Sequence, residues 1–148
     1  MDRIEFAEFV KARARELAEK ETFEPIVFIL KDEGIGVFPL SFPKTLWRPI
    51  LVTVLQQLKA DAYVFATEAW RCDLPEDSPW RKKIESGKLR VRDLPPEDLS
   101  EDLLVCYVDK LGSKAWIAPI KAGYIGGWKP TDEGGDIELG GEMVIKEW

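Results

Sequence analysis

The chain has 148 residues, of which 32% are charged and 45% hydrophobic, and its formal net charge at pH 7 is −6. This length is typical of a single domain with a substantial core, and the acidic balance limits any binding of nucleic acid or anionic lipid to a local patch. The sequence contains no histidine, which excludes Ser-His-Asp and Cys-His catalysis and histidine-ligated metal sites.

The sequence offers no membrane or export signal. No stretch approaches the roughly 18 consecutive apolar residues of a membrane span, and the first residues lack the apolar segment of a signal peptide. We therefore expect a cytoplasmic protein. Asparagine is absent and only two glutamines occur among many lysines, arginines and glutamates, which resembles the composition of thermophile proteins.

The first half of the chain predicts two helices around a hairpin. Residues 2–20 have the apolar spacing of an amphipathic helix. Two β-rich runs follow at 26–30 and 35–40, separated by a short loop that ends in glycine, which predicts a β-hairpin. Pro39 should end the second strand or place it at an edge of the sheet. Residues 46–60 show the strongest helical period and should form the central core helix.

Three more strands are expected in the second half. Residues 62–70 alternate as a strand does, and the runs LLVCYVDK and KAWIAPIKA, separated by LGS, predict a second hairpin. The last 27 residues, 122–148, contain seven of the eleven glycines. Such a segment buries little by itself, so we expect it to pack on the domain or on a partner.

A charged crossover insert, residues 73–101, separates the first of these strands from the second hairpin. It contains its own helix signal, with Ser78 as N-cap, Pro79 at the first position and Gly87 as terminator. The following run KLRVRDL alternates as a short edge strand would. Residues 1–121 are therefore predicted to form one domain that carries this insert.

The order of elements, α-β-β-α-β-β-β, predicts an α+β fold with two main helices and an antiparallel sheet of about five strands. This order is similar to that of the roadblock, longin and profilin-like folds, which mostly serve as dimerising or docking scaffolds. The motif TEAW (Thr67–Trp70), followed by a proline- and charge-rich loop and an EDLLV strand, resembles a loose group of small phage and prokaryotic proteins over residues 23–121. That resemblance implies no activity.

The insert contains the most basic stretch of the sequence. Six basic residues fall within 81–92 against one acid, and five acids with no basic residue follow at 93–102. A basic groove beside an aromatic side chain such as Trp80 is what single-stranded nucleic acid or another anion requires. The alternative, which we favour, is that the downstream acids neutralise the cations within the molecule. The basic residues are Arg81, Lys82, Lys83, Lys88, Arg90 and Arg92.

Glu68 is a candidate catalytic carboxylate. It falls in the middle of a predicted strand, on the face that carries Val64 and Ala66, where an ionised group is costly unless it is paired. Beside a second acid in a cleft its pKa would be raised, and it could act as a general base. The simpler interpretation is that this face meets solvent, or that an arginine such as Arg48 or Arg71 pairs with Glu68.

No cofactor or metal is expected. The acids near the glycines of 132–138 do not follow the EF-hand pattern, and the sequence contains no P-loop and no dinucleotide-binding glycine motif. Cys72 and Cys106 lie 34 positions apart without the spacing of a zinc or redox site. Cys106 is predicted to be a small buried hydrophobe, and a disulfide between the two stays open.

Six tryptophans are present, and Trp80, Trp128 and Trp148 fall in the irregular segments that can bury them least. Tryptophan is enriched at the centres of protein interfaces. We therefore predict a non-enzymatic protein-protein binding or scaffold domain that can form a homodimer, with contacts through the insert and the tail. Two alternatives stay open: a nucleic-acid-binding accessory protein that uses residues 81–92, and an enzyme that uses the carboxylate of Glu68.

Overall fold

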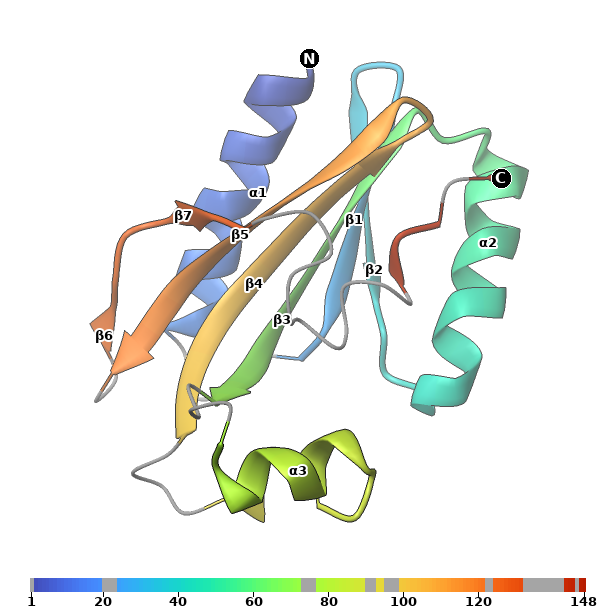
Figure 1. Ribbon diagram of the computed structural model, residues 1–148. Helices are drawn as coiled ribbons and strands as arrows, with labels where there is room; N and C mark the ends of the chain where they lie inside the picture. The colour runs from blue at the N-terminus through green and yellow to red at the C-terminus, as the bar shows by residue number, and fades with distance from the viewer. Residues whose placement is uncertain are drawn as a thin grey trace.

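A helix covers each face of a curled antiparallel sheet (Figure 1). The computed structural model describes residues 2–19, 24–72, 77–89, 93–94, 99–121, 124–131, 143–145 and 147–148, with the backbone alone at 70–72. In chain order the elements are α1 (Arg3–Ala18), β1 (Ile26–Lys31), β2 (Gly34–Pro39), the 3-10 helix η1 (Lys44–Leu46), α2 (Trp47–Leu58), β3 (Ala62–Cys72), α3 (Pro79–Glu85), β4 (Leu99–Asp109), β5 (Gly112–Lys121), β6 (Tyr124–Ile125) and β7 (Lys129–Pro130).

The strands follow one another across the sheet in the order β2-β1-β3-β4-β5-β6, and β7 also pairs with β5. Every pairing is antiparallel. The α+β class and the antiparallel sheet are therefore confirmed. The predicted strand number of about five is too low, because the described part of the chain forms seven strands. The two that were missed, β6 and β7, have two residues each and exist only by pairing with β5.

Helix α1 begins at an N-cap and packs on one face of the sheet. The Asp2 carboxylate accepts a hydrogen bond from Glu5 N at 2.8 Å, which satisfies one N–H of the first turn. The buried stripe of Phe6, Val10 and Ala14 packs in the first of two hydrophobic clusters, against β1, β3 and β4. In the described residues no helix is long and apolar enough to cross a membrane.

Helix α2 packs on the opposite face. Leu51 and Leu55 are fully buried in a second cluster that includes Tyr63 and Phe65 of β3. The helix ends where Lys59 adopts the left-handed conformation, with φ of 51°. The predicted helix, residues 46–60, is close to the observed bounds of α2. Not every apolar residue of the predicted stripe is buried, since Leu58 keeps 48% of its surface exposed.

The end of the chain joins the second cluster. Met143 and Ile145 are buried beside the Tyr63 side chain. The Tyr63 hydroxyl donates to Met143 O and accepts from Ile145 N at 2.8 Å. The described residues of this part of the tail therefore pack on the domain.

The crossover insert contains the predicted helix but differs in detail. Helix α3 begins after Ser78, whose side chain makes no capping bond, and Gly87 follows its end with φ of 77°. No side chain of α3 is buried, and Figure 1 places this helix below the end of β3, away from α1 and α2. The expected edge strand is not present at Lys88 and Leu89, which lie in a turn region, and 90–92 fall outside the described residues.

Candidate functional site

One edge of the sheet is open. β2 is the outermost strand on its side, and no described residue pairs with its outer edge. Four of its six residues are exposed, and Val37 keeps 57% of its surface open to solvent. No charged side chain occurs between Gly34 and Pro39. Edge strands are generally protected by charges, bulges or a covering segment, so this β2 edge (Gly34–Pro39) is a candidate surface for strand pairing.

The hydrogen bonds of the hairpin determine which backbone groups of β2 face outward. Leu40 N donates to Pro25 O at 2.9 Å, immediately beyond the paired part of the two strands. Hydrogen-bonded pairs alternate with non-bonded pairs along an antiparallel ladder. Pro39, Val37 and Ile35 therefore belong to non-bonded pairs. Their backbone N–H and C=O groups, except the N–H that proline lacks, point away from β1.

The hydrogen bonds near the turn of the β1–β2 hairpin also show that the backbone groups of Ile35 point away from β1. Asp61 N donates to Leu30 O at 2.8 Å, so the Leu30 carbonyl points toward β3. Leu30 is the β1 partner of Ile35. Because the N–H and C=O of one residue in an extended strand point the same way, Ile35 has no bond to Leu30. Its backbone groups are open to an incoming strand.

One exposed apolar side chain of α1 lies toward this edge. Phe9 keeps 44% of its surface exposed. Two positions further, Lys11 turns toward β5, where its Nζ lies 4.6 Å from the centre of the Trp116 ring. Residues two apart on a helix point about 200° apart, so Phe9 faces the side of β1 and β2. Val37 is on this same face of the sheet, opposite Phe28 of the first cluster.

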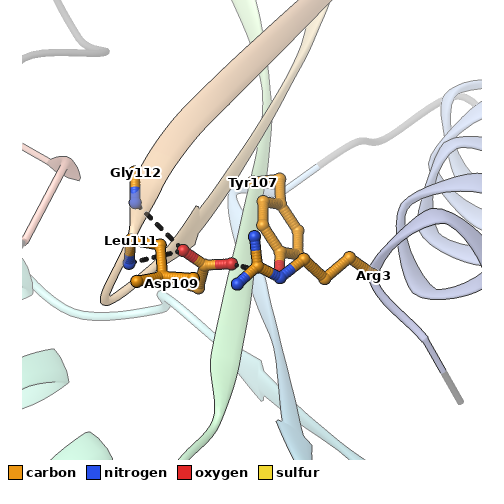
Figure 2. A network of polar contacts seen from close by, with 5 residues as sticks. All are labelled: Arg3, Tyr107, Asp109, Leu111 and Gly112. Atoms are coloured by element: carbon orange, nitrogen blue, oxygen red, sulfur yellow. Dashed lines mark hydrogen bonds and ion pairs between the residues drawn. The ribbon is translucent and has the colours of Figure 1, made fainter.

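A pocket of about 1020 Å³ opens at the end of the sheet where the two hairpin turns lie. Its walls come from the start of α1, the end of α2, both turns and Trp148. Figure 2 shows the polar network within it: the Asp109 carboxylate accepts from Leu111 N at 2.8 Å, Gly112 N at 3.0 Å and the Tyr107 hydroxyl at 2.8 Å. Arg3 Nε also lies 2.9 Å from the Asp109 carboxylate and forms an ion pair with it.

This network is better suited to anchoring than to chemistry. Asp109 is buried and its oxygens are occupied by four donors. Burial, and then the hydrogen bond to Asp109 and its charge, raise the pKa of Tyr107 above the ordinary value of a tyrosine. These residues were not predicted from the sequence, although an aspartate just before a turn is a known signal for side-chain bonding to turn N–H groups.

Glu68 has a carboxyl partner. It lies on β3 opposite Leu103, and Glu101 lies diagonally from it on β4, on the face of the sheet that α1 covers. Partial burial, then the hydrogen bond and repulsion from Glu101, raise the pKa of Glu68 to about 7. Arg48 belongs to α2 on the opposite face of the sheet, and the side chain of Arg71 falls outside the described part of the structure. Neither acid lines the pocket described above, and the general-base hypothesis stays a prediction.

The basic residues of the insert lie on α3 and after it. Arg81 pairs with Glu85 within the helix at 3.2 Å, and Lys83 Nζ lies 5.1 Å from the centre of the Trp80 ring. Lys82 and Lys88 are exposed. Arg90, Arg92 and the acids Glu97 and Asp98 fall outside the described residues, while Glu101 and Asp102 are part of β4. Neutralisation of the cations by these acids therefore stays a prediction, as does binding of nucleic acid.

The three tryptophans that were predicted to bind a partner do not form one surface. Trp148 Nε1 donates to Ala60 O at 2.9 Å near the pocket. Trp128 packs on the first cluster with the Arg15 guanidinium 5.5 Å from its ring centre. Trp80 lies on α3 and keeps 39% of its surface exposed.

Cys106 is a buried free thiol, as the sequence predicted for a small hydrophobe, and burial raises its pKa to about 11. It lies opposite Phe65, whereas Cys72 lies opposite Leu99 at the far end of the same strand pair. A disulfide between the two is therefore not formed. Among the described residues, no group of three or more cysteines and carboxylates is placed to hold a metal ion.

Comparison of the chain with protein-family models, with characterised proteins and with solved structures gave no match.

Proposed function

We propose that this protein is a non-enzymatic binding module that takes up an extended segment of a partner chain as an additional strand at the β2 edge. The observation that carries this proposal is the row of outward-facing backbone groups at Ile35 and Val37, on an edge strand without charges. Strand addition of this kind draws its affinity from main-chain hydrogen bonds and its selectivity from the alternating side chains.

The two faces of the β2 edge would select different side chains. On the face that α1 covers, Val37 and, from α1, Phe9 are exposed apolar side chains. On the other face, Gly34 and Gly36 are exposed and carry no side chain, which leaves room for larger side chains of the partner. An apolar residue alternating with a bulky one is therefore the expected pattern of a bound segment.

Trp80 supports a second contact. It is exposed on a helix that buries none of its own side chains, and exposed tryptophans are frequent in binding hot spots. Helix α3, which carries Trp80, lies beyond the end of β3, whereas the two hairpin turns lie at the opposite end of the sheet (Figure 1). A partner that reached both Trp80 and the β2 edge would have to extend along the molecule.

Selection from a displayed library of random peptides tests the proposal. Selected peptides should protect the backbone amides of Ile35 and Val37 from hydrogen exchange. They should lose binding to Val37→Pro, because this substitution removes an outward N–H that has no partner within the hairpin. Leu111→Lys, at an apolar residue that is 82% exposed at the other hairpin turn, is a surface control and should bind the peptides as the wild type does. Peptides that leave both amides unprotected, or that bind Val37→Pro equally well, would overturn the proposal.

A further inference from the structure

We propose that the strand which pairs with β2 is the β2 strand of a second copy of this chain. The two strands would run antiparallel about a two-fold axis at Gly36, so that the sheets of both copies form one continuous sheet. This inference rests on the proposed function, since it names the partner of the same β2 edge. Its support comes from the hydrogen-bond pattern, the charges at the two ends of β2, and the exposed apolar side chains.

The hydrogen-bonding groups of β2 are self-complementary. With the axis at Gly36, Ile35 of each copy lies opposite Val37 of the other, and every N–H and C=O of these two residues is paired. An axis at Val37 would instead place Ile35 opposite Pro39, which has no N–H to donate. The Ile35 carbonyls would then be left unpaired at a buried position, which is costly. The axis at Gly36 is therefore the favoured register.

The charges at the two ends of the strand are also complementary. The hairpin turn at the start of β2 carries Asp32 and Glu33, with Asp61 bonded to Asp32 N at 2.7 Å. The segment that follows β2, residues 41–48, contains Lys44 and Arg48 and no acid. Because identical antiparallel strands bring the start of one beside the end of the other, each acidic turn would approach the basic segment of the second copy.

The exposed apolar side chains would be covered by the same arrangement. Ile35 and Val37 share one face of the sheet, because they are two residues apart. The axis at Gly36 brings these side chains from both copies together on the face that α1 covers. Val37, which is 57% exposed in one chain, would be buried in the pair. The interface is small, so we expect a weak and concentration-dependent dimer.

Sedimentation velocity of the full chain from about 1 to about 500 µM tests this inference, because that range brackets weak dimers. The protein should shift from monomer to dimer, and Ile35 and Val37 should become protected from hydrogen exchange as the dimer forms. Val37→Lys should weaken dimerisation at least about tenfold, since it places a charge at the centre of the paired strands. Leu111→Lys makes the same change in charge away from β2 and should dimerise as the wild type does.

A second substitution guards against a variant that fails to fold. A Cβ at Gly36 would lie 4.0 Å from Ile29 O, an ordinary contact, so a single chain can accept Gly36→Glu. In the dimer the two glutamates would face each other across the axis, and like charges directly opposite are unfavourable. Gly36→Glu should therefore remain folded by circular dichroism and lose the dimer.

A charge exchange tests the register. Glu33→Lys and Lys44→Glu should each weaken the dimer, and the two changes together should restore it, because each turn faces the basic segment of the other copy. High salt, about 500 mM, should also weaken the dimer by screening. If none of these changes alters the dimerisation affinity, the dimer interface does not lie at β2.

The test separates this inference from the proposed function. A chain that stays monomeric over the whole range overturns the second copy as the partner. If library peptides nevertheless protect Ile35 and Val37 in that monomer, strand addition at the β2 edge stands with a different partner. If neither a second copy nor a peptide protects these amides, both proposals fail.

Discussion

The buried carboxylate of Asp109 and the guanidinium of Arg3 join the end of β4 to the first turn of α1, at 2.9 Å (Figure 2). The same carboxylate closes the β4–β5 turn through Leu111 N and Gly112 N. One side chain thus fixes both the hairpin and the position of a helix that begins far away in the sequence.

Asp109→Ala should lower the free energy of unfolding by about 3 kcal/mol, because it leaves two turn N–H groups and the Tyr107 hydroxyl without their acceptor. Arg3→Ala should cost about 1 kcal/mol or less, since the Arg3 side chain is 55% exposed and its pairing is screened by solvent. Urea denaturation of the two variants measures whether Asp109→Ala is the more destabilising of the two. Equal losses would contradict the central role of the carboxylate.

The raised pKa of Glu68 predicts that stability falls as the pH rises from about 4.5 to about 7. The pKa of Glu68 is raised from 4.5 to about 7 in the folded chain, so between these values the folded state holds a proton that the unfolded state has lost. Stability from this group is therefore complete below about pH 4.5 and is lost as the pH passes 7. Because Glu68 is partly open to solvent, we expect a loss of only about 1 kcal/mol.

Glu68→Gln checks the direction of this effect. Glutamine can donate to Glu101 but does not ionise, so the variant should unfold at a higher denaturant concentration than the wild type at pH 8, with little difference at pH 5. Glu16→Gln, on the exposed side of α1, is the control and should leave the pH dependence unchanged. A wild type that becomes more stable between pH 5 and pH 8, relative to Glu68→Gln, would exclude the raised pKa of Glu68.

Tyr63→Phe should release the described end of the tail while the sheet stays folded. The substitution removes the hydroxyl that bonds Met143 O and Ile145 N, and we expect a loss of about 2 kcal/mol because both backbone groups are buried. Hydrogen exchange at the Ile145 amide should accelerate more than exchange at the amides of β4. Tyr124→Phe, at a residue that is 81% exposed, should change neither.

Trp80→Ala should change the free energy of unfolding by less than about 0.5 kcal/mol, because α3 buries none of its side chains. Trp47→Ala should cost about 3 kcal/mol, since Trp47 packs against the second cluster and donates from Nε1 to Phe42 O at 2.9 Å. Thermal denaturation of both variants measures the difference. A large loss of unfolding free energy in Trp80→Ala would mean that Trp80 stabilises the fold and is not an exposed contact for a partner.

The predictions from sequence succeeded where the signal is local. The apolar period of residues 46–60 follows from the one face that α2 buries, and Pro39 correctly indicated both the end of β2 and its place at the edge. The runs IVFIL and LLVCYV are apolar throughout because β1 and β4 are covered on both faces. These features depend on residues within a few positions of one another.

The features that were missed depend on pairing between distant parts of the chain. The diagonal contact of Glu68 with Glu101 requires the register of β3 against β4, which spans the whole insert. The packing of Ile145 on Tyr63 joins residues that are 82 positions apart. Strands of two residues such as β6 have no period of their own. No pattern within a short window carries such information.

The ends of β3 and β4 have a consequence for how this chain can change in length. Cys72 and Leu99 are paired neighbours, so the polypeptide departs from the sheet and returns to it at almost the same point. Lengthening the connection between them at an exposed position therefore costs little loop-closure entropy. We therefore expect the sheet to stay folded when a reporter peptide is inserted after Ser86.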